Sequence, residues 1–220
     1  MKTLFLMLLI ILIAACPVYA EGQKTSLIWT EQYRWHGIEV FGKDYVHPGV
    51  STSVGGIDFS AVTHLGDAHD NIEYWDTIVG YKLPVAGLDM KVGYGYLIFP
   101  GVDIQEISAT VSLPGTISPR YTISHAIPDE GDSGQFHVFG ADLFLGEPDK
   151  ISAVLMGDIT FNDYDPDIRD FTHTTCGAVL NVPVGKVVLS PAVFWQHTLE
   201  PAISDNVDEV WFAVSASYEF

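Results

Sequence analysis

Cysteine and basic residues are scarce in this chain of 220 residues. Its only cysteines are Cys16 and Cys176. Cys16 lies in an apolar N-terminal segment, and a single remaining cysteine cannot form an intrachain disulfide. This excludes a small exported domain held together by disulfides. There are 10 Lys and Arg against 28 Asp and Glu, a formal net charge of −18. Because phosphate binding needs clustered basic side chains, this balance argues against nucleic acid as a partner.

Long hydrophobic runs are also absent after the N-terminus. Lys2 precedes an apolar run from Leu4 to Ala15, and Val18 to Ala20 offers small or apolar residues before a cut. This pattern is typical of a secretory signal peptide, and the run is too short to span a bilayer as a helix. We expect residues 1–20 to be a cleaved signal and 21–220 to be the mature chain, without a transmembrane helix. Lipidation at Cys16, after a sequence that resembles a lipobox, is the competing interpretation.

The repeating signal in the rest of the chain has a period of two residues. Between 88 and 99, the even positions are Leu88, Met90, Val92, Tyr94, Tyr96 and Ile98, whereas the odd positions include Asp89, Lys91, Gly93 and Gly95. Strict alternation of this kind indicates a β-strand with one apolar face and one polar or small face. The same alternation recurs at 151–161 and leads back from Phe220 through Tyr218, Ala216, Val214 and Phe212.

Turn residues divide the chain into twelve such segments. They are 25–36, 48–55, 57–66, 71–83, 87–99, 103–113, 117–128, 135–146, 151–162, 171–182, 186–198 and 209–220. Most have the length that a tilted transmembrane strand needs. Tight turns such as Gly55-Gly56 alternate with mostly longer polar loops, Pro100 to Val102 being a short exception. An even strand number with short turns on one side predicts an all-β, antiparallel, up-and-down transmembrane β-barrel in a bacterial outer membrane.

A secreted β-sandwich or a lipocalin-like barrel is the soluble alternative. Its outward face should be polar, and its core would have to bury the charged positions of these segments. In nearly every segment the apolar face carries large side chains, which favours contact with lipid.

The last ten residues, Trp211 to Phe220, resemble the C-terminal signal by which the assembly machinery of outer-membrane barrels recognises its substrates. The chain also resembles the TorF-type family of outer-membrane porins. That resemblance rests on Tyr33 to Ile38 (YRWHGI), Gly93 to Gly101 (GYGYLIFPG) and Asp103 to Glu106 (DIQE). The family often has Arg where this chain has His36. The resemblance implies a porin-like channel.

Function in a barrel lies on lumen-facing side chains and in the outer loops. We expect the lumen to be lined by charged residues of both signs: Arg34, Asp76, Lys82, Lys91, Glu106, Arg120, Asp142 and Asp158. These charges either line a narrow polar path or pair and plug it. Asp163, Asp165 and Asp167 crowd one outer loop and resemble the start of a calcium loop, but the Gly and the distant Glu of such a loop are missing.

The sequence therefore predicts a porin-like channel for passive diffusion of small solutes, with a cation preference because the loops are acidic. A non-conducting structural or binding barrel is the alternative, and an enzyme at the outer mouth is a weaker one. Ser124 and His125 point to opposite faces of a strand and cannot form a catalytic pair. No cofactor is expected. The expected partners are membrane lipid, lipopolysaccharide, the barrel-assembly machinery and small solutes.

Overall fold

The structure is a computed structural model that describes residues 22–31, 33–36, 38–41, 45–66, 74–99, 102–147, 149–163, 169–200 and 208–219. The expected signal segment and Phe220 lie outside these ranges. Within the described ranges there is no helix of the length and apolar character needed to cross a membrane.

All described elements are strands. Their bounds are β1 (Gly22–Thr30), β2 (Tyr33–Trp35), β3 (Ile38–Phe41), β4 (Tyr45–Val54), β5 (Ile57–Gly66), β6 (Tyr74–Leu83), β7 (Asp89–Phe99), β8 (Val102–Ser112), β9 (Ile117–Pro128), β10 (Gly134–Leu145), β11 (Ser152–Asn162), β12 (Asp170–Val184), β13 (Val187–Thr198) and β14 (Asp208–Glu219). Twelve of them form the barrel wall, and β2 with β3 forms a separate two-stranded hairpin.

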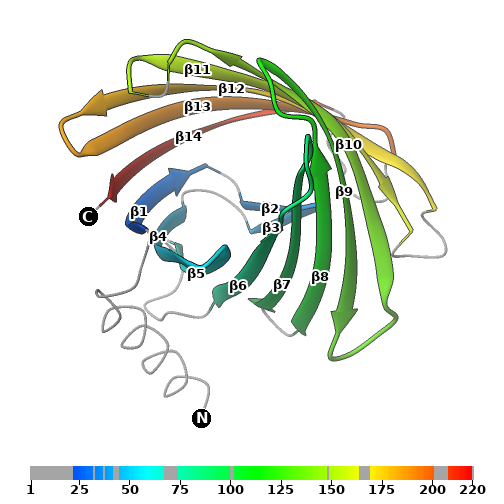
Figure 1. Ribbon diagram of the computed structural model, residues 1–220. Coiled ribbons are helices and arrows are strands. Elements are labelled where there is room, and N and C mark those ends of the chain that lie inside the picture. The colour runs from blue at the N-terminus through cyan, green and yellow to red at the C-terminus, as the bar shows by residue number, and fades with distance from the viewer. Residues whose placement is uncertain are drawn as a thin grey trace.

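The wall is a closed ring of antiparallel neighbours, as predicted, in which sequence neighbours pair except where β4 follows the inserted hairpin (Figure 1). Closure is made by β1, which pairs with β4 on one side and with β14 on the other. Lys24 faces Glu219 and Trp29 faces Val214 across the β1–β14 seam. A closed ring leaves no strand edge unpaired, which is the condition for a sheet to reside in lipid.

The predicted first strand is wrong in one respect. It was expected to run from 25 to 36, but β1 ends at Thr30 and Tyr33 to Trp35 form β2. The hairpin β2–β3 is inserted between β1 and β4, and Figure 1 shows it within the ring of strands. The two-residue alternation therefore predicted a strand at 33–35 correctly. That strand belongs to the inserted hairpin and not to the barrel wall.

The turns at one end of the barrel are short. Gly55 and Gly56 have φ values of 57° and 80°, the left-handed conformation that a two-residue hairpin of type I′ requires and that glycine adopts without steric cost. The first residue of β1 and the last of β14 lie at this same end, which we call the short-turn end. The opposite end, called the loop end, carries the mostly longer links.

The two faces of the wall differ in chemistry. Large apolar side chains are exposed on the outward face, among them Leu27, Tyr94, Ile107, Phe139 and Phe212. The inward face carries the polar partners of the alternation, including Ser26, Asp58, Lys91, Arg120 and Asp158, as the strand register requires. An apolar outside with a polar inside is the arrangement of a barrel that stands in lipid.

Candidate functional site

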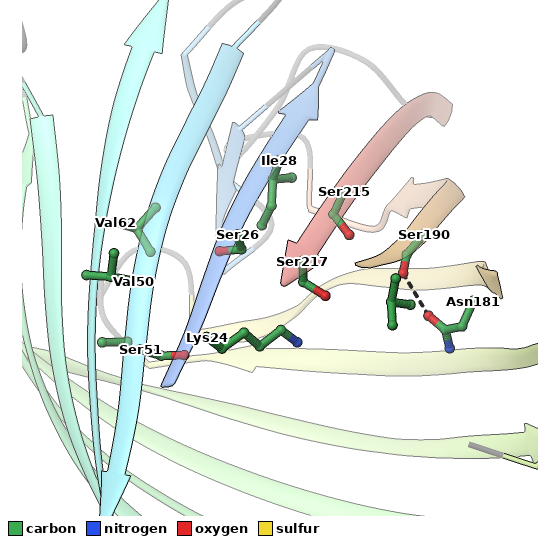
Figure 2. Close-up of a pocket in the computed structure, with 12 residues that line it drawn as sticks. Lys24, Ser26, Ile28, Val50, Ser51, Val62, Asn181, Ser190, Ser215 and Ser217 are labelled. Atoms are coloured by element: carbon green, nitrogen blue, oxygen red, sulfur yellow. Dashed lines mark hydrogen bonds between the residues drawn. The ribbon is translucent and has the colours of Figure 1, made fainter. Parts of the chain in front are cut away.

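The lumen at the short-turn end is hollow, and we call this half the vestibule. It contains a cavity of about 370 Å³ against the inner faces of β1, β4, β5, β12, β13 and β14. Small hydroxyl side chains line much of it, and Figure 2 shows that Lys24 and Asn181 share this wall with them. Ser190 donates a hydrogen bond to Asn181 Oδ1 over 2.8 Å. Short side chains leave the volume free, and their hydroxyl groups make the wall polar.

The opposite wall of the vestibule carries ion pairs. Arg120 of β9 reaches Asp142 of β10 at 3.2 Å and Asp158 of β11 at 3.1 Å. Strand register explains the reach, because Arg120, Gly140 and Asp158 lie side by side on three neighbouring strands. A Cβ at position 140 would come within 3.1 Å of Arg120 Cζ. Because Gly140 has no side chain, the guanidinium of Arg120 has room to reach Asp158.

A second ion pair repeats this construction. Lys91 of β7 binds Asp58 of β5 at 3.1 Å and passes over Gly80 of β6, where a Cβ would clash with the lysine side chain. Ser53 also donates a 2.6 Å hydrogen bond to Asp58. Lys91 is more exposed than Arg120, with about half of its side-chain surface open against about a fifth. The vestibule thus holds charges of both signs, and Lys91 and Arg120 are paired with three of its carboxylates.

The lumen at the loop end is filled, and we call this half the neck. All buried polar and charged side chains except Thr52 and Ser118 lie in the loop-end part of their strands. Those on β4, β5, β6 and β14 include His47, His64, Asp76 and Glu209, and those on β9 to β13 include Ser124, Thr160, Asn162, His173 and Gln196. Buried apolar residues of the same layer are Leu97, Ile104, Phe136 and Trp211. The neck therefore resembles a packed core more than an open pore.

One buried chain of polar contacts crosses the neck wall. His64 Nε2 lies 2.9 Å from Asp76 Oδ2, and the other ring nitrogen of His64 contacts Nδ1 of His47. The three residues come from neighbouring strands β4, β5 and β6 and are all nearly inaccessible. A carboxylate on one ring nitrogen fixes the histidine so that its other nitrogen faces the second ring. These contacts link three neighbouring strands through buried polar side chains.

The tip of the β2–β3 hairpin is anchored on the far wall of the neck. His36 Nε2 lies 3.0 Å from Glu106 Oε2 of β8. The ring of His36 also stacks on that of Phe136 of β10, with centroids 4.1 Å apart and planes within 8°. Phe136 has no exposed surface. The tip of the hairpin therefore reaches across the lumen to β8 and β10.

The structure places seven of the eight expected lumen residues on the inward face. Asp76 and Glu106 lie in the neck, whereas Lys82, Lys91, Arg120, Asp142 and Asp158 lie in the vestibule. Arg34 belongs to β2, and its side chain lies outside the described residues. That these side chains contact a solute stays a prediction.

Sequence reasoning missed the central residues of the neck. The contacts of His36, Phe136 and His64 carried no local signal, because each depends on partners from other strands. Trp211, near the start of β14, points inward and stacks on Phe194, with ring centroids 5.4 Å apart. Trp211 and Glu209 are two residues apart on the same strand and therefore share a face, so the inward position of Trp211 could have been predicted from the sequence.

The acidic loop gives no support for a metal site. Asp165 and Asp167 lie outside the described residues, and Asp163 pairs with Arg169 at 3.1 Å. Across the part of the chain that the structure describes, no group of three or more His, Cys, Asp and Glu side chains is arranged to hold a metal ion.

Comparison with solved structures relates this geometry to known proteins. The KdgM porin aligns with a TM-score of 0.61 at 8% identity, covering 90% of this chain and 99% of that one. An outer membrane channel from Pseudomonas putida F1 aligns with a TM-score of 0.54 at 11% identity, covering 93% and 98%. The fold is that of the outer-membrane porins. A bacterial polysaccharide outer membrane secretin is similar too, with a TM-score of 0.53 at 8% identity over 90% of this chain and 98% of that one.

Identities this low show a common fold and leave function to the site itself. The chain matches no protein-family model, and the search of curated proteins gives no match either.

Proposed function

We propose that the chain is an outer-membrane channel for passive diffusion of small polar solutes. One observation carries the proposal: a closed barrel with an apolar outer face contains a polar cavity of about 370 Å³ at one end. A barrel with a structural role alone has no need of an unfilled, serine-lined interior. The packed neck is the one feature that favours the alternative, a non-conducting structural or binding barrel. Whether the neck can open therefore decides between a channel and a non-conducting barrel.

The proposed location is the bacterial outer membrane, with residues 1–20 as a cleaved export signal. The exposed apolar residues of the outer face would contact membrane lipid, and the acidic loop end would face lipopolysaccharide and its counter-ions. Trp211 to Phe220 would direct the chain to the barrel-assembly machinery. Membership of the TorF-type family is part of this proposal and rests on the three sequence stretches given above.

The proposed selectivity is for cations over anions. The neck holds the inward-facing carboxylates of Asp76, Glu106 and Glu209, and none of its described side chains is a Lys or Arg. A ring of carboxylates in a narrow, low-dielectric passage concentrates cations and repels anions. In the vestibule Lys91 and Arg120 are bound to carboxylates, which reduces their positive potential, whereas Lys24 and Lys82 have no ion pair within the described residues.

The likeness to KdgM extends to a structure of that porin in complex with disordered oligogalacturonate. Recognition of such a polyanion calls for clustered basic side chains. Of the basic side chains that the structure describes in the lumen, Lys91 and Arg120 are bound to carboxylates, and Lys24 and Lys82 lie on strands that are not neighbours, so we propose small neutral or cationic solutes instead. Oligogalacturonate serves as a negative control in the transport assay.

Planar-bilayer recording tests the channel directly. The purified protein is compared with a loop-shortened barrel, in which residues 31–44 are replaced by Asn-Gly. Thr30 and Tyr45 are register partners on β1 and β4, so a two-residue turn can join the strands and keep their pairing. The replacement removes one side-chain contact with β14, the hydrogen bond that the Glu31 carboxylate accepts from Phe212 N–H. We expect conductance steps from at least the loop-shortened barrel. Their absence from both proteins would exclude the channel and leave the structural or binding barrel.

The cation preference has its own measurement. In a tenfold KCl gradient, the reversal potential of the conducting barrel should have the sign of a K⁺-selective pore. The double variant Asp76→Asn/Glu209→Gln should move it towards zero, because it removes two carboxylates of the neck. Glu147→Gln/Asp149→Asn, in an exposed turn at the short-turn end, is the charge-matched control. An anion-selective reversal potential would contradict the preference without affecting the channel proposal.

A further inference from the structure

We propose that the β2–β3 hairpin is a gate whose tip residue, His36, is latched on Glu106 and Phe136 and closes the neck. The proposal rests on the channel function proposed above. It assigns to the hairpin two positions, one across the lumen as the structure shows and one withdrawn from it. Three side chains, His36, Glu106 and Phe136, contribute to holding the closed position.

Strand order shows that the hairpin must cross the lumen to make these contacts. In the ring of twelve strands, β10 lies six places from β4 and five from β1, the two strands that flank the hairpin. Phe136 is therefore on the wall opposite the point of insertion. Its ring and the carboxylate of Glu106 point inward, and His36 meets both. A segment in this position obstructs any path along the barrel axis.

The barrel wall does not depend on the hairpin. β1 and β4 pair continuously with each other from Gly22↔Ser53 to Thr30↔Tyr45, immediately before and after the inserted segment. The hairpin forms its own two-stranded sheet and pairs with no wall strand in the described residues. Withdrawal of the hairpin would therefore break no hydrogen bond of the wall ladder. This separation is what distinguishes a movable gate from a structural plug.

The two contacts of His36 contribute a definable share to the closed position. A hydrogen bond to a charged group together with one aromatic stack favours a bound position by roughly 30- to 2,000-fold. Both partners of the hydrogen bond keep some contact with solvent, 14% of the His36 side chain and 17% of the Glu106 side chain, which places the value toward the lower end.

The backbone at the latch supports a specific role for His36. Its φ of 47° is the only positive value at a non-glycine residue within the described ranges. Asparagine or glycine would adopt this conformation more readily. A histidine there keeps an unfavourable backbone conformation while its ring makes the two contacts across the lumen. Strain of this kind is retained where the side chain is needed.

Single-channel recording of His36→Asn tests the latch. Asparagine tolerates the left-handed backbone but lacks the ring that stacks on Phe136. We expect the wild-type protein to be closed for most of the time, with brief openings. The open probability should rise at least tenfold in His36→Asn and in Glu106→Gln. The loop-shortened barrel should be open continuously.

His197→Asn is the matched control. His197 pairs with Asp208 at the same 3.0 Å distance as His36 with Glu106, but its side chain lies on the outward face at the loop end. Its open probability should equal that of the wild type. Folding of every variant is verified by the shift in electrophoretic mobility between unheated and heated samples.

The outcomes separate the gate from the channel. If the wild-type and loop-shortened barrels conduct equally and continuously, the gate is wrong and the channel stands. If neither conducts, both proposals fall. If the loop-shortened barrel conducts but His36→Asn and Glu106→Gln behave as the wild type, the hairpin closes the neck without this latch, and the proposal is wrong as stated.

Discussion

The two halves of the lumen are built from different kinds of side chain, although the same twelve strands pass through both. The vestibule has serines, long ion-paired side chains and glycines beneath them, and it leaves a cavity open. The neck has aromatic rings, histidines and buried carboxylates, and a hairpin fills it. The wall therefore determines that a lumen exists, whereas the inward side chains and one inserted segment determine where it is open.

This difference predicts where substitutions are costly. Neck residues are packed against one another, so their removal leaves cavities or unpaired polar groups. Vestibule residues keep contact with solvent, which can replace a lost partner. The free energy of unfolding, measured by urea titration of the barrel in micelles or vesicles, should reflect this contrast.

The largest loss is expected for Phe136→Ala. Truncation of a fully buried phenylalanine typically lowers the free energy of unfolding by about 3–5 kcal/mol, and this ring also supports His36. Phe139→Ala, three residues along the same strand but on the outward face with 46% of its surface exposed, is the control. We expect the control to lose less than half as much. Equal losses would mean that the neck is no better packed than the outer face.

A smaller loss is expected for Arg120→Met in the vestibule. It leaves Asp142 and Asp158 facing each other without their shared cation, which costs about 1–3 kcal/mol when partial exposure is taken into account. The triple variant Arg120→Met/Asp142→Asn/Asp158→Asn should recover most of this stability, because it also removes the repulsion. A triple variant as unstable as Arg120→Met would show that packing of the arginine stem, and not charge, is responsible.

Gly140→Ala should cost about 1–2 kcal/mol by forcing Arg120 away from Asp158. The added Cβ would also lie 2.9 Å from the carbonyl oxygen of Gly157, which cannot move easily. Gly157→Ala is the control, because its Cβ would meet Cys176 Sγ at an ordinary 3.8 Å. Similar unfolding curves for the two variants would contradict the role given to Gly140.

The smallest effect is expected for Lys91→Met, at less than about 1 kcal/mol. Lys91 binds Asp58 with much of its side chain in solvent, and exposed ion pairs of this kind contribute little to stability. The loss should diminish further in 0.5 M salt, whereas that of Phe136→Ala should not. A loss for Lys91→Met comparable with that of Phe136→Ala would remove the distinction between vestibule and neck.

The barrel wall could be predicted from sequence because its rule is local. Alternation with a period of two, interrupted by turn residues, placed a strand at 117–128 that the structure has at Ile117–Pro128 and one at 57–66 that it has at Ile57–Gly66. Antiparallel order and closure then followed from the even count and from the cost of an unpaired edge in lipid. The residues of the inward face could also be predicted, because alternate side chains of a strand point to opposite faces of the sheet.

The contents of the neck could not be predicted in the same way. Tyr33 to Trp35 alternate as a wall strand would, and a local pattern does not reveal whether a strand joins the wall or an inserted hairpin. His36 meets Glu106 across 70 residues of sequence. His47, His64 and Asp76 come from three different strands, so their contact depends on strand register and not on spacing along the chain.

Thiol accessibility along the lumen tests the division into an open vestibule and a closed neck most directly. Ser60→Cys and Ser124→Cys, each in a Cys176→Ala background, place the same group on the inward face of the vestibule and of the neck. With a water-soluble, membrane-impermeant maleimide, we predict that Ser60→Cys reacts at least tenfold faster than Ser124→Cys. Shortening the loop between β1 and β4 should remove most of that difference. Equal rates in the intact barrel would contradict the account.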